Sequence, residues 1–338
     1  HRRRSAQVGD GSCPQSRMGQ IVIRYAGKGI AASTGRSDIK DMNNSLMAGV
    51  DIGGSHITAA LLDTATGAIV PETWQRNSVP AGGTVEEIID AWSAVIRTSY
   101  ARQSTPVRIG IAMPGPFDYE EGICYIQGQQ KYEALYGLNI KELLAERLGF
   151  SKDNIRLTND AACFLQGEVF AGAAKGHAAV IGLTLGTGLG SATFFHHHVE
   201  DAAWWNAPFK ESIAEDYLSS RWFVQRYQQL TTLSVPNVKQ LLNTADEMNI
   251  RSVFDEFGVN LGTFLQQRLR EQPAELIIIG GNIAQAFSLF EKTLHDTLRS
   301  SGIQTPVKQA ILGEQAALIG AATAGLEGKF NPHEKYHY

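Results

Sequence analysis

The chain has 338 residues, of which 43% are hydrophobic and 19% charged, with a formal net charge of −4. This balance is typical of a globular protein, and the length accommodates two domains with a core in each. No apolar run approaches the ~20 residues that a membrane-spanning helix needs, so we expect no membrane segment. The cysteines Cys13, Cys124 and Cys163 have no paired spacing, which argues against disulfides or a zinc knuckle and favours a reducing cytoplasm.

Positive charge is concentrated at the start of the chain. Residues 1–41 carry eight Lys or Arg and three Asp or Glu, whereas the remainder carries 22 and 31. The segment lacks the long apolar stretch of a secretion signal, although its charge could attract nucleic acid or a membrane surface. We expect residues 1–41 to be a disordered leader outside the fold, translated or added in cloning, with Met42 or Met47 as a more natural start.

Short apolar runs alternate with helical patterns through the rest of the chain. Residues 48–52 and 57–62 predict a strand, a glycine turn and a returning strand, and residues 179–185 and 191–195 predict a second such hairpin. We interpret the two hairpins as a diverged internal repeat, one per domain. Further strands are expected at 107–112, 155–158 and 276–279, and helices at 85–100, 138–148, 161–171, 213–230, 237–242, 253–270 and 314–326. The alternation predicts an α/β fold with sheets covered on both faces.

Each predicted hairpin has a glycine-rich turn, DIGGSH at 51–56 and LGTGLG at 185–190. Glycine turns bring backbone N–H groups close to an anion, and Asp51 beside Gly53 and Gly54 could hold a hydrated Mg²⁺ through water. The second turn is not a Walker loop, because no Gly-Lys-Ser/Thr follows it. Ordinary hairpin turns share this composition, so each turn alone leaves the structural alternative open.

Asn159 and Asp160 close a predicted strand and open a predicted helix between the two glycine turns. Both residue types are good helix N-caps, which is the structural alternative. In the functional alternative, Asp160 is the base that accepts a hydroxyl proton and Asn159 binds a neighbouring hydroxyl. Their position between two phosphate turns favours phosphoryl transfer onto an alcohol. Gly280 and Gly281, after the strand at 276–279, could equally allow an adenosine to pass close to the backbone or simply connect strand to helix.

Five segments in order resemble the ROK family of sugar kinases and repressors, within the hexokinase and actin-like ATPase superfamily. They are DIGGSH at 51–56, GIAMPGP at 110–116, LTNDAACFLQGE at 157–168, LTLGTGLG at 183–190 and IIIGGNI at 277–283. The resemblance covers nearly all of residues 47–325. It implies a two-domain actin-like ATPase (ribonuclease H-like) fold with a central cleft, an N-terminal domain at 42–160 joined by a C-terminal helix at 314–328, and a C-terminal domain at 161–313.

The resemblance also implies an ATP-dependent hexose kinase that uses Mg²⁺ and forms a homodimer. Asp160 would be the catalytic base, and Asp51 would assist Mg²⁺ through water. The substrate-binding residues would be Asn159, Glu215 and Gly115. The nucleotide would contact Asp51 and the glycine segments, namely Gly53, Gly54, Gly186, Thr187, Gly188, Gly190, Gly280 and Gly281.

The chain departs from the family pattern before Glu215. Most members have a Gly-Glu-x-Gly-His stretch and a cysteine-rich zinc site there, whereas this chain has FFHHHVEDAAWWNAPFKES, without cysteine. No structural zinc is therefore expected. We expect the run 196–198 to be structural or exposed, because neighbouring strand residues face opposite sides. Glu200, Asp201, Trp205 and Asn206 are the candidates to replace the missing sugar contacts.

The primary hypothesis is an ATP-dependent hexose kinase located in the cytoplasm, without a nucleic-acid or membrane partner. One rival is a sugar-responsive transcriptional regulator, but residues 1–46 are too glycine-rich and too short for the helix-turn-helix module of such proteins. Another is a sugar-binding protein that has lost catalysis, which the altered zinc region keeps open. The two glycine turns that are predicted to bind phosphate argue against this alternative, since a protein that only binds sugar needs no phosphate-binding site.

Overall fold

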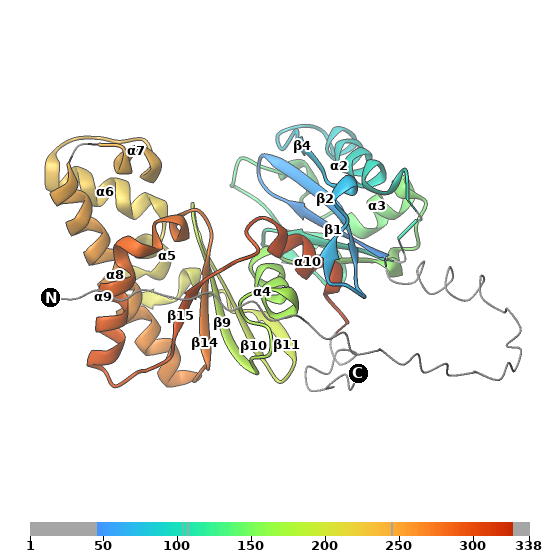
Figure 1. Ribbon diagram of the computed structural model, residues 1–338. Coiled ribbons are helices and arrows are strands. Elements are labelled where there is room, and N and C mark those ends of the chain that lie inside the picture. The colour runs from blue at the N-terminus through green and yellow to red at the C-terminus, as the bar shows by residue number, and fades with distance from the viewer. Residues whose placement is uncertain (1–45, 104, 107, 245, 327–338) are drawn as a thin grey trace, which may run out of the picture.

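The computed structural model describes residues 46–103, 105–106, 108–244 and 246–326. The leader predicted at 1–41 lies outside the described residues. Figure 1 shows two α/β lobes, each built on one sheet, with α4 and α10 between them. No helix within the described ranges has the length and hydropathy needed to cross a bilayer.

The first sheet has six strands in the order β3-β2-β1-β5-β8, with β4 paired to β2. β1 is antiparallel to β2 and parallel to β5, which is parallel to β8. Alternate residues of β1 face opposite sides: Ala48 and Val50 pack into the core beneath α2 and α3, whereas Gly49 faces α10. The elements of this lobe are β1 (Leu46–Ile52), β2 (His56–Asp63), β3 (Ala68–Ile69), β4 (Gln75–Ser78), α2 (Val85–Tyr100), β5 (Ile109–Met113), β6 (Phe117–Asp118), β7 (Ile123–Cys124), α3 (Ile140–Leu148) and β8 (Ile155–Asn159).

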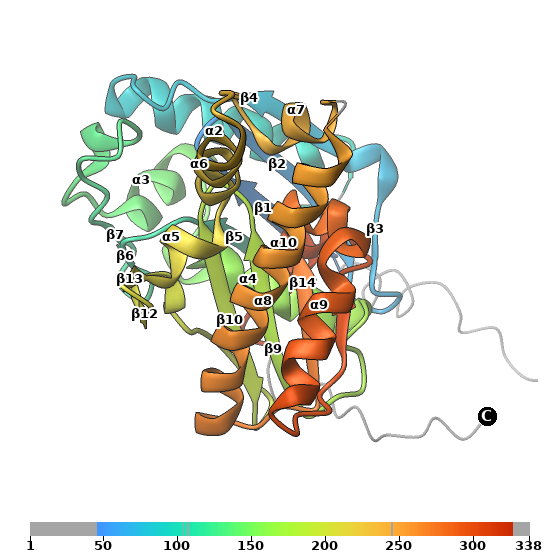
Figure 2. The same ribbon diagram turned by 90° about the vertical axis from the view of Figure 1, so that its left-hand side faces the viewer.

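The second sheet has five strands in the order β11-β10-β9-β14-β15. Ile181 and Leu183 of β9 face the core under α8 and α9, while Val180 faces α4 on the other side. Figure 2 shows α8 and α9 in front of this sheet. The elements here are α4 (Asp160–Ala171), β9 (Ala179–Leu185), β10 (Leu189–Phe195), β11 (His198–Asp201), β12 (Pro208–Phe209), β13 (Ser212–Ile213), α5 (Ala214–Leu218), α6 (Ser220–Thr231), α7 (Val238–Leu242), α8 (Glu247–Glu271), β14 (Leu276–Gly280), α9 (Phe287–Ser300), β15 (Val307–Gln309) and α10 (Gln315–Thr323).

The two halves share one order of elements. The first half runs in the order β1, β2, β3, α2, β5, α3, β8 and α4. The second half has the corresponding elements in the same order, namely β9, β10, β11, α8, β14, α9, β15 and α10, and the corresponding strands pair in the same way in both sheets. The segment α5–α7 is an addition to the second half. This common topology supports the internal repeat that the two glycine hairpins predict.

α10 is the last helix of the described chain, yet it packs against β1 and β5 of the first sheet and along α4 (Figure 1). Backbone meets backbone at these contacts. A Cβ atom at Gly110 of β5 would overlap the carbonyl of Ala321, and one at Gly320 would overlap the carbonyl of Cys163. Glycine is therefore required at both positions by close approach, which places the two helices at a fixed distance.

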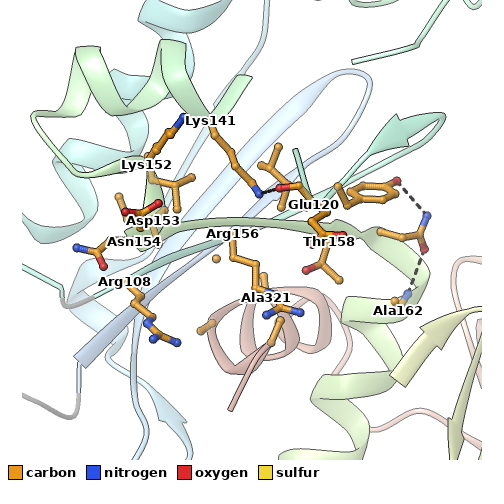
Figure 3. A pocket seen from close by; sticks show the side chains of 18 of the residues that line it. Arg108, Glu120, Lys141, Lys152, Asp153, Asn154, Arg156, Thr158, Ala162 and Ala321 are labelled. Atoms are coloured by element: carbon orange, nitrogen blue, oxygen red, sulfur yellow. Dashed lines mark hydrogen bonds between the residues drawn. The ribbon is translucent and has the colours of Figure 1, made fainter. Parts of the chain in front are cut away.

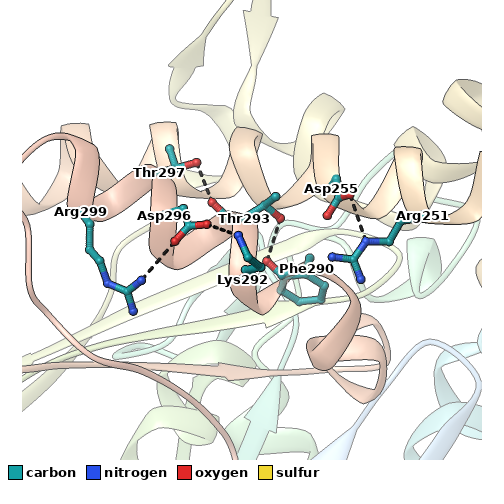
Figure 4. A network of polar contacts seen from close by, with 8 residues as sticks. All are labelled: Arg251, Asp255, Phe290, Lys292, Thr293, Asp296, Thr297 and Arg299. Carbon is teal, nitrogen blue, oxygen red and sulfur yellow. Dashed lines mark hydrogen bonds and ion pairs between the residues drawn. The ribbon is translucent and has the colours of Figure 1, made fainter.

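α8 and α9 pack side by side in the second lobe. Their exposed faces carry the ion pairs Arg251–Asp255 at 3.0 Å and Lys292–Asp296 at 2.6 Å, each within one helix (Figure 4). The Thr293 hydroxyl donates to the carbonyl of its own helix at Phe290 over 3.2 Å. Exposed pairs at this spacing contribute a few tenths of a kcal/mol each, so the buried apolar side chains between the helices supply most of the stability.

Several predicted boundaries were wrong. The helix predicted at 213–230 is two helices, because the N–H and the hydroxyl of Ser220 both donate to the Gly186 carbonyl at 2.8 Å and Ser219 is extended. The helix predicted at 314–328 ends at Thr323, where Ala324 leaves helical geometry and Gly325 has a φ of 82°. Of the helices and strands not predicted, the longest is α9.

We expect Gly110→Ala to lower the free energy of unfolding by about 2 kcal/mol or more, because the new methyl group overlaps the backbone of α10. Chemical denaturation at equilibrium measures this change. The matched control is Gly82→Ala, since a Cβ there meets nothing within 4 Å and the change should stay within about 0.5 kcal/mol. Equal stabilities for the two variants would show that α10 accommodates the methyl group by moving.

Candidate active site

Asp51 lies near the end of β1, directly before the first glycine turn. The turn is closed by the Gly53 N–H, which donates to the His56 carbonyl at 2.9 Å. Burial raises the pKa of Asp51 to about 6, with further raising by the charges of Asp160 and Glu314 and an opposing contribution from Arg76. A carboxylate that is poorly solvated and near another carboxylate is well placed to attract a cation.

The second glycine turn joins β9 and β10 and is attached to α5 and α6. Its Gly186 N–H donates to the Gly188 carbonyl at 3.1 Å. The Leu189 N–H donates to Oε2 of Glu215 at 3.0 Å, which holds this predicted substrate ligand against the turn. Arg221 lies 3.5 Å from the same carboxylate.

Asp160 is the first residue of α4 and follows β8 without a loop. Oδ1 of Asn159 accepts from the N–H groups of Ala161 and Ala162 at 2.9 and 3.1 Å, so Asn159 is the N-cap of this helix. Its amide donates to the Tyr119 hydroxyl at 3.3 Å. Asp160 Oδ1 accepts from the Ala161 N–H at 2.8 Å. The cap holds the Asp160 backbone in place at a helix N-terminus, where positive potential favours an anion.

A cavity of about 1040 Å³ brings most of the predicted site together. It is lined by parts of both lobes, including Asp201 at the end of β11 and Trp205. The predicted residues in its lining are Gly115, Asn159, Asp160, Gly186, Thr187, Gly188, Gly190, Glu215 and Gly281. The second glycine turn therefore faces the same space as the predicted substrate ligands.

A second cavity of about 500 Å³ lies on the other side of Asp160. The predicted residues in its lining are Asp51, Gly53, Asp160, Gly280 and Gly281. Four residues line both cavities, namely Asp160, Thr184, Gly281 and Asn282. Gly54 lines neither, and a Cβ there would lie 3.3 Å from Cδ of Lys131. Asp160 is therefore the carboxylate that lines both cavities. Protein surrounds this residue, but it is exposed to the two cavities.

The environment of Asp160 favours a basic carboxylate. Burial between the lobes raises its pKa most, and the charge of Asp201 raises it further, while the Ala161 N–H and the charge of Lys131 lower it. Burial also raises the pKa of Asp201. A carboxylate whose pKa lies nearer to neutrality is a stronger base for an alcohol proton than one in bulk water.

The donors available for a metal ion are few. Over the ranges that the structure describes, no group of three or more His, Cys, Asp or Glu side chains could hold one. A single carboxylate such as Asp51 would suit a hydrated Mg²⁺ that takes its other ligands from water and phosphate oxygens. The histidine run is exposed, which agrees with the prediction: His196 and His197 form the β10–β11 turn with positive φ, and His198 begins β11.

Several residues of the site have no motif that marks them in the sequence. Of the four candidate replacements for the missing sugar contacts, Asp201 and Trp205 line the larger cavity, and Glu200 and Asn206 do not. The motifs also gave no indication of other residues in the same lining, of which the charged or hydroxyl-bearing ones are Tyr119, Lys131, Ser191 and Arg221. They come from loops, a strand and a helix that lie far apart in the chain.

A third cavity, of about 720 Å³, runs along the open edge of β8 (Figure 3). It contains neither glycine turn, and it is lined by cations as well as by acidic side chains such as Asp153. The Lys141 ammonium donates to the Glu120 carbonyl (Figure 3) and Lys152 pairs with Glu142 at 2.9 Å. This cavity shares Tyr119, Asn159 and Asp201 with the larger one, whereas the charges of Lys141 and Lys152 are satisfied locally and are not part of the candidate active site.

Comparison with known proteins shows which proteins the chain resembles. Residues 47–201 match the model of the ROK family. A glucokinase of Thermotoga maritima is 25% identical over 317 residues, which cover 81% of this chain and 95% of that protein. An N-acetyl-D-glucosamine kinase of Shigella boydii serotype 4 is 24% identical over 309 residues, covering 81% of this chain and 97% of that protein. The predicted resemblance to the ROK family is confirmed by this match over residues 47–201.

The fold is also that of solved relatives. A ROK family glucokinase from Streptomyces griseus, solved in complex with glucose and AMPPNP, has a TM-score of 0.66 and 24% identity over 82% of this chain and 98% of that one. The predicted α/β actin-like ATPase fold is therefore confirmed. The rival hypothesis of a transcriptional regulator depends on residues 1–46, of which 1–45 lie outside the described residues.

We expect Asp51→Asn to stabilise the metal-free protein at pH 7.5 by an amount on the order of 2 kcal/mol. The pKa of Asp51 rises from 3.8 to about 6 on folding, so the folded state bears a desolvation penalty above pH 6 that disappears below pH 4. Asparagine removes the charge and hence the penalty. Thermal unfolding in EDTA at pH 7.5 and pH 4 measures the gain, which should vanish at the lower pH. A variant less stable than wild type at pH 7.5 would mean that the carboxylate stabilises the fold.

Proposed function

We propose that the protein transfers the γ-phosphoryl group of ATP to a hydroxyl of a hexose, with Asp160 as the general base. The observation that supports this most is that Asp160 lines both cavities, one with Asp51 and one with Glu215. A base shared by two adjoining spaces can contact an alcohol in one while a nucleotide reaches in from the other. The match to the ROK family model and the names of the relatives agree with this activity.

The nucleotide is proposed to lie along the smaller cavity, with its phosphates directed toward Asp160. Gly280 and Gly281 line this cavity where the adenosine would lie, and Gly53 lines it where the first turn would meet the phosphates, with Gly54 next to it in the turn. Gly186, Thr187, Gly188 and Gly190 would hold the terminal phosphate from the other side, where their turn faces the larger cavity. Bound Mg²⁺ would neutralise negative charge on the phosphates, and Asp51 would hold it through water.

The hexose is proposed to occupy the larger cavity beside Asn159, Glu215 and Gly115. Asp160 takes the proton of the attacking hydroxyl as its oxygen bonds to the γ-phosphorus, and the bond from that phosphorus to the bridging oxygen of ADP breaks. The raised pKa of Asp160 makes this proton transfer more favourable. Most of the rate enhancement comes from positioning and charge neutralisation.

The domains are proposed to be residues 42–160 with the C-terminal helix, and residues 161–313. Closure of these domains over the hexose would exclude water, which otherwise competes as phosphoryl acceptor. The relatives include a glucokinase and an N-acetyl-D-glucosamine kinase, so glucose and N-acetylglucosamine are the first acceptors to test. A homodimer is proposed on family likeness alone.

The experiment is a coupled assay of ADP release with Mg·ATP and a panel of glucose, N-acetylglucosamine, mannose and glucosamine. We expect release that depends on one of these sugars. Asp160→Ala should keep the fold and lower kcat by roughly 10²–10⁴-fold, because the hydroxyl then loses its base. Asp153→Asn, an exposed carboxylate in the third cavity, is the control and should keep wild-type turnover.

Two outcomes would count against the proposal. Turnover of Asp160→Ala equal to that of wild type would remove Asp160 from the mechanism. Sugar binding by calorimetry without ADP release from any sugar would favour the hypothesis of a binding protein that has lost catalysis.

A further inference from the structure

The segment around Lys131 is anchored to the first glycine turn. Tyr132 is completely buried, its hydroxyl donates to the Gly53 carbonyl at 2.5 Å, and its ring meets Trp92 edge-on at 5.2 Å. The Tyr132 N–H donates to the Ala81 carbonyl at 2.6 Å. These contacts fix the backbone of Lys131 relative to the turn that is proposed to bind phosphate.

The backbone on both sides of Lys131 is strained. Gln130 and Tyr132 have φ values of 57° and 58°, a conformation that side chains other than glycine rarely adopt. Such strain persists where surrounding contacts over-determine the conformation, and it is concentrated at functional sites. Here the two strained residues direct the side chain of Lys131, which lies between them, toward the larger cavity.

The side chain of Lys131 is half-buried and reaches from the first turn toward Asp160. Its Cδ lies beside Gly54, at 3.3 Å from the position of a Cβ there, and the residue lines the larger cavity together with Asp160. The positive charge lowers the pKa of Asp160, which is consistent with this proximity. Lys131 therefore lies between the turn and the base.

The other cations of the two cavities already have carboxylate partners. Arg221 lies 3.5 Å from Glu215, and Arg76 lies 2.8 Å from Glu314. Within the described part of the chain, no carboxylate lies within ion-pair distance of Lys131. A half-buried ammonium without a counter-ion is costly unless an anion occupies the neighbouring space.

We propose that Lys131 binds the oxygens of the phosphoryl group in transfer, as a point charge between the first glycine turn and Asp160. This assignment rests on the proposed kinase activity, since it is the terminal phosphate of ATP that would reach this point. It adds a phosphate-binding cation to a site whose glycine turns supply N–H groups and no charge. Charge-assisted bonds to phosphate are about twice as strong as neutral ones and strengthen as charge develops.

The test compares the binding of AMP-PNP and of ADP by calorimetry, with Mg²⁺ and without sugar. We expect Lys131→Met to weaken AMP-PNP binding about 10- to 100-fold, the equivalent of one charged hydrogen bond, and to leave ADP binding unchanged. Lys131→Arg should restore most of the affinity, because the charge is kept. Lys152→Met, whose ammonium pairs with Glu142 in the third cavity, is the matched control. Turnover of Lys131→Met with the best sugar should fall in kcat.

Three results would overturn the assignment. Equal weakening of AMP-PNP and ADP would place the charge away from the terminal phosphate, and unchanged binding of both would remove it from nucleotide recognition. A higher KM for the sugar with an unchanged kcat would show that the ammonium contacts the acceptor. If Lys131→Met does not fold, as thermal unfolding would show, Lys131→Gln gives the same comparison.

A wrong assignment of Lys131 can be distinguished from a wrong proposal of kinase activity. A wild-type protein that phosphorylates a sugar while Lys131→Met behaves identically removes Lys131 and leaves the kinase proposal intact. A wild-type protein that binds AMP-PNP but phosphorylates no sugar overturns the kinase proposal, and the AMP-PNP and ADP comparison still tests the position of the charge.

Discussion

The position of Asp160 depends on the close approach of α4 and α10. The two helices lie against each other with backbone in contact at Gly320, and α10 also lies against the first sheet at Gly49 and Gly110. In a close-packed interior a methyl group at such a contact forces the elements apart. Because α4 starts at Asp160, any shift of this helix pair moves the carboxylate relative to both cavities.

Carboxylates at the junction of the lobes oppose the stability of the fold. Burial raises the pKa of Asp51, Asp160 and Asp201, and the charges of Asp51 and Asp160 act on each other. Such desolvated like charges destabilise the empty protein at neutral pH. The same arrangement favours a bound cation and a proton in transfer, so the unfavourable electrostatics are consistent with the proposed chemistry and are offset by the apolar cores of both lobes.

Local patterns predicted elements whose cause is local. The helix at Val85–Tyr100 matches the prediction at both ends, because its apolar stripe is regular and Thr84 and Glu87 form a capping box. The helix α9 has a similar stripe at Phe287, Phe290, Leu294 and Leu298, so the signal for it was available in the sequence. The break at Ser219 was not predictable, since it depends on the bond from Ser220 to Gly186, 34 residues away.

The site was predictable to the extent that glycine and Asp motifs mark it. Those motifs lie at strand ends, and parallel pairing of β1, β5 and β8 brings the strand ends to one edge of the sheet. Lys131 and Arg221 reach the cavity from a loop and from the first turn of α6, without a motif. Tertiary packing of Tyr132, rather than the sequence around Lys131, directs that side chain.

The repeat bears on why one carboxylate, rather than two, is proposed as the base. α4 follows β8 of the first sheet and packs on the second, while α10 follows β15 of the second sheet and packs on the first. Asp160 is the first residue of α4 and Glu314 is the N-cap of α10, so both carboxylates lie at the starts of the two exchanged helices. Glu314 is neutralised by Arg76 of β4, a strand that has no counterpart among the described strands of the second sheet. Among the residues that the structure describes, Asp160 has no such ion pair, so the added strand in one half makes the starts of the two helices chemically different.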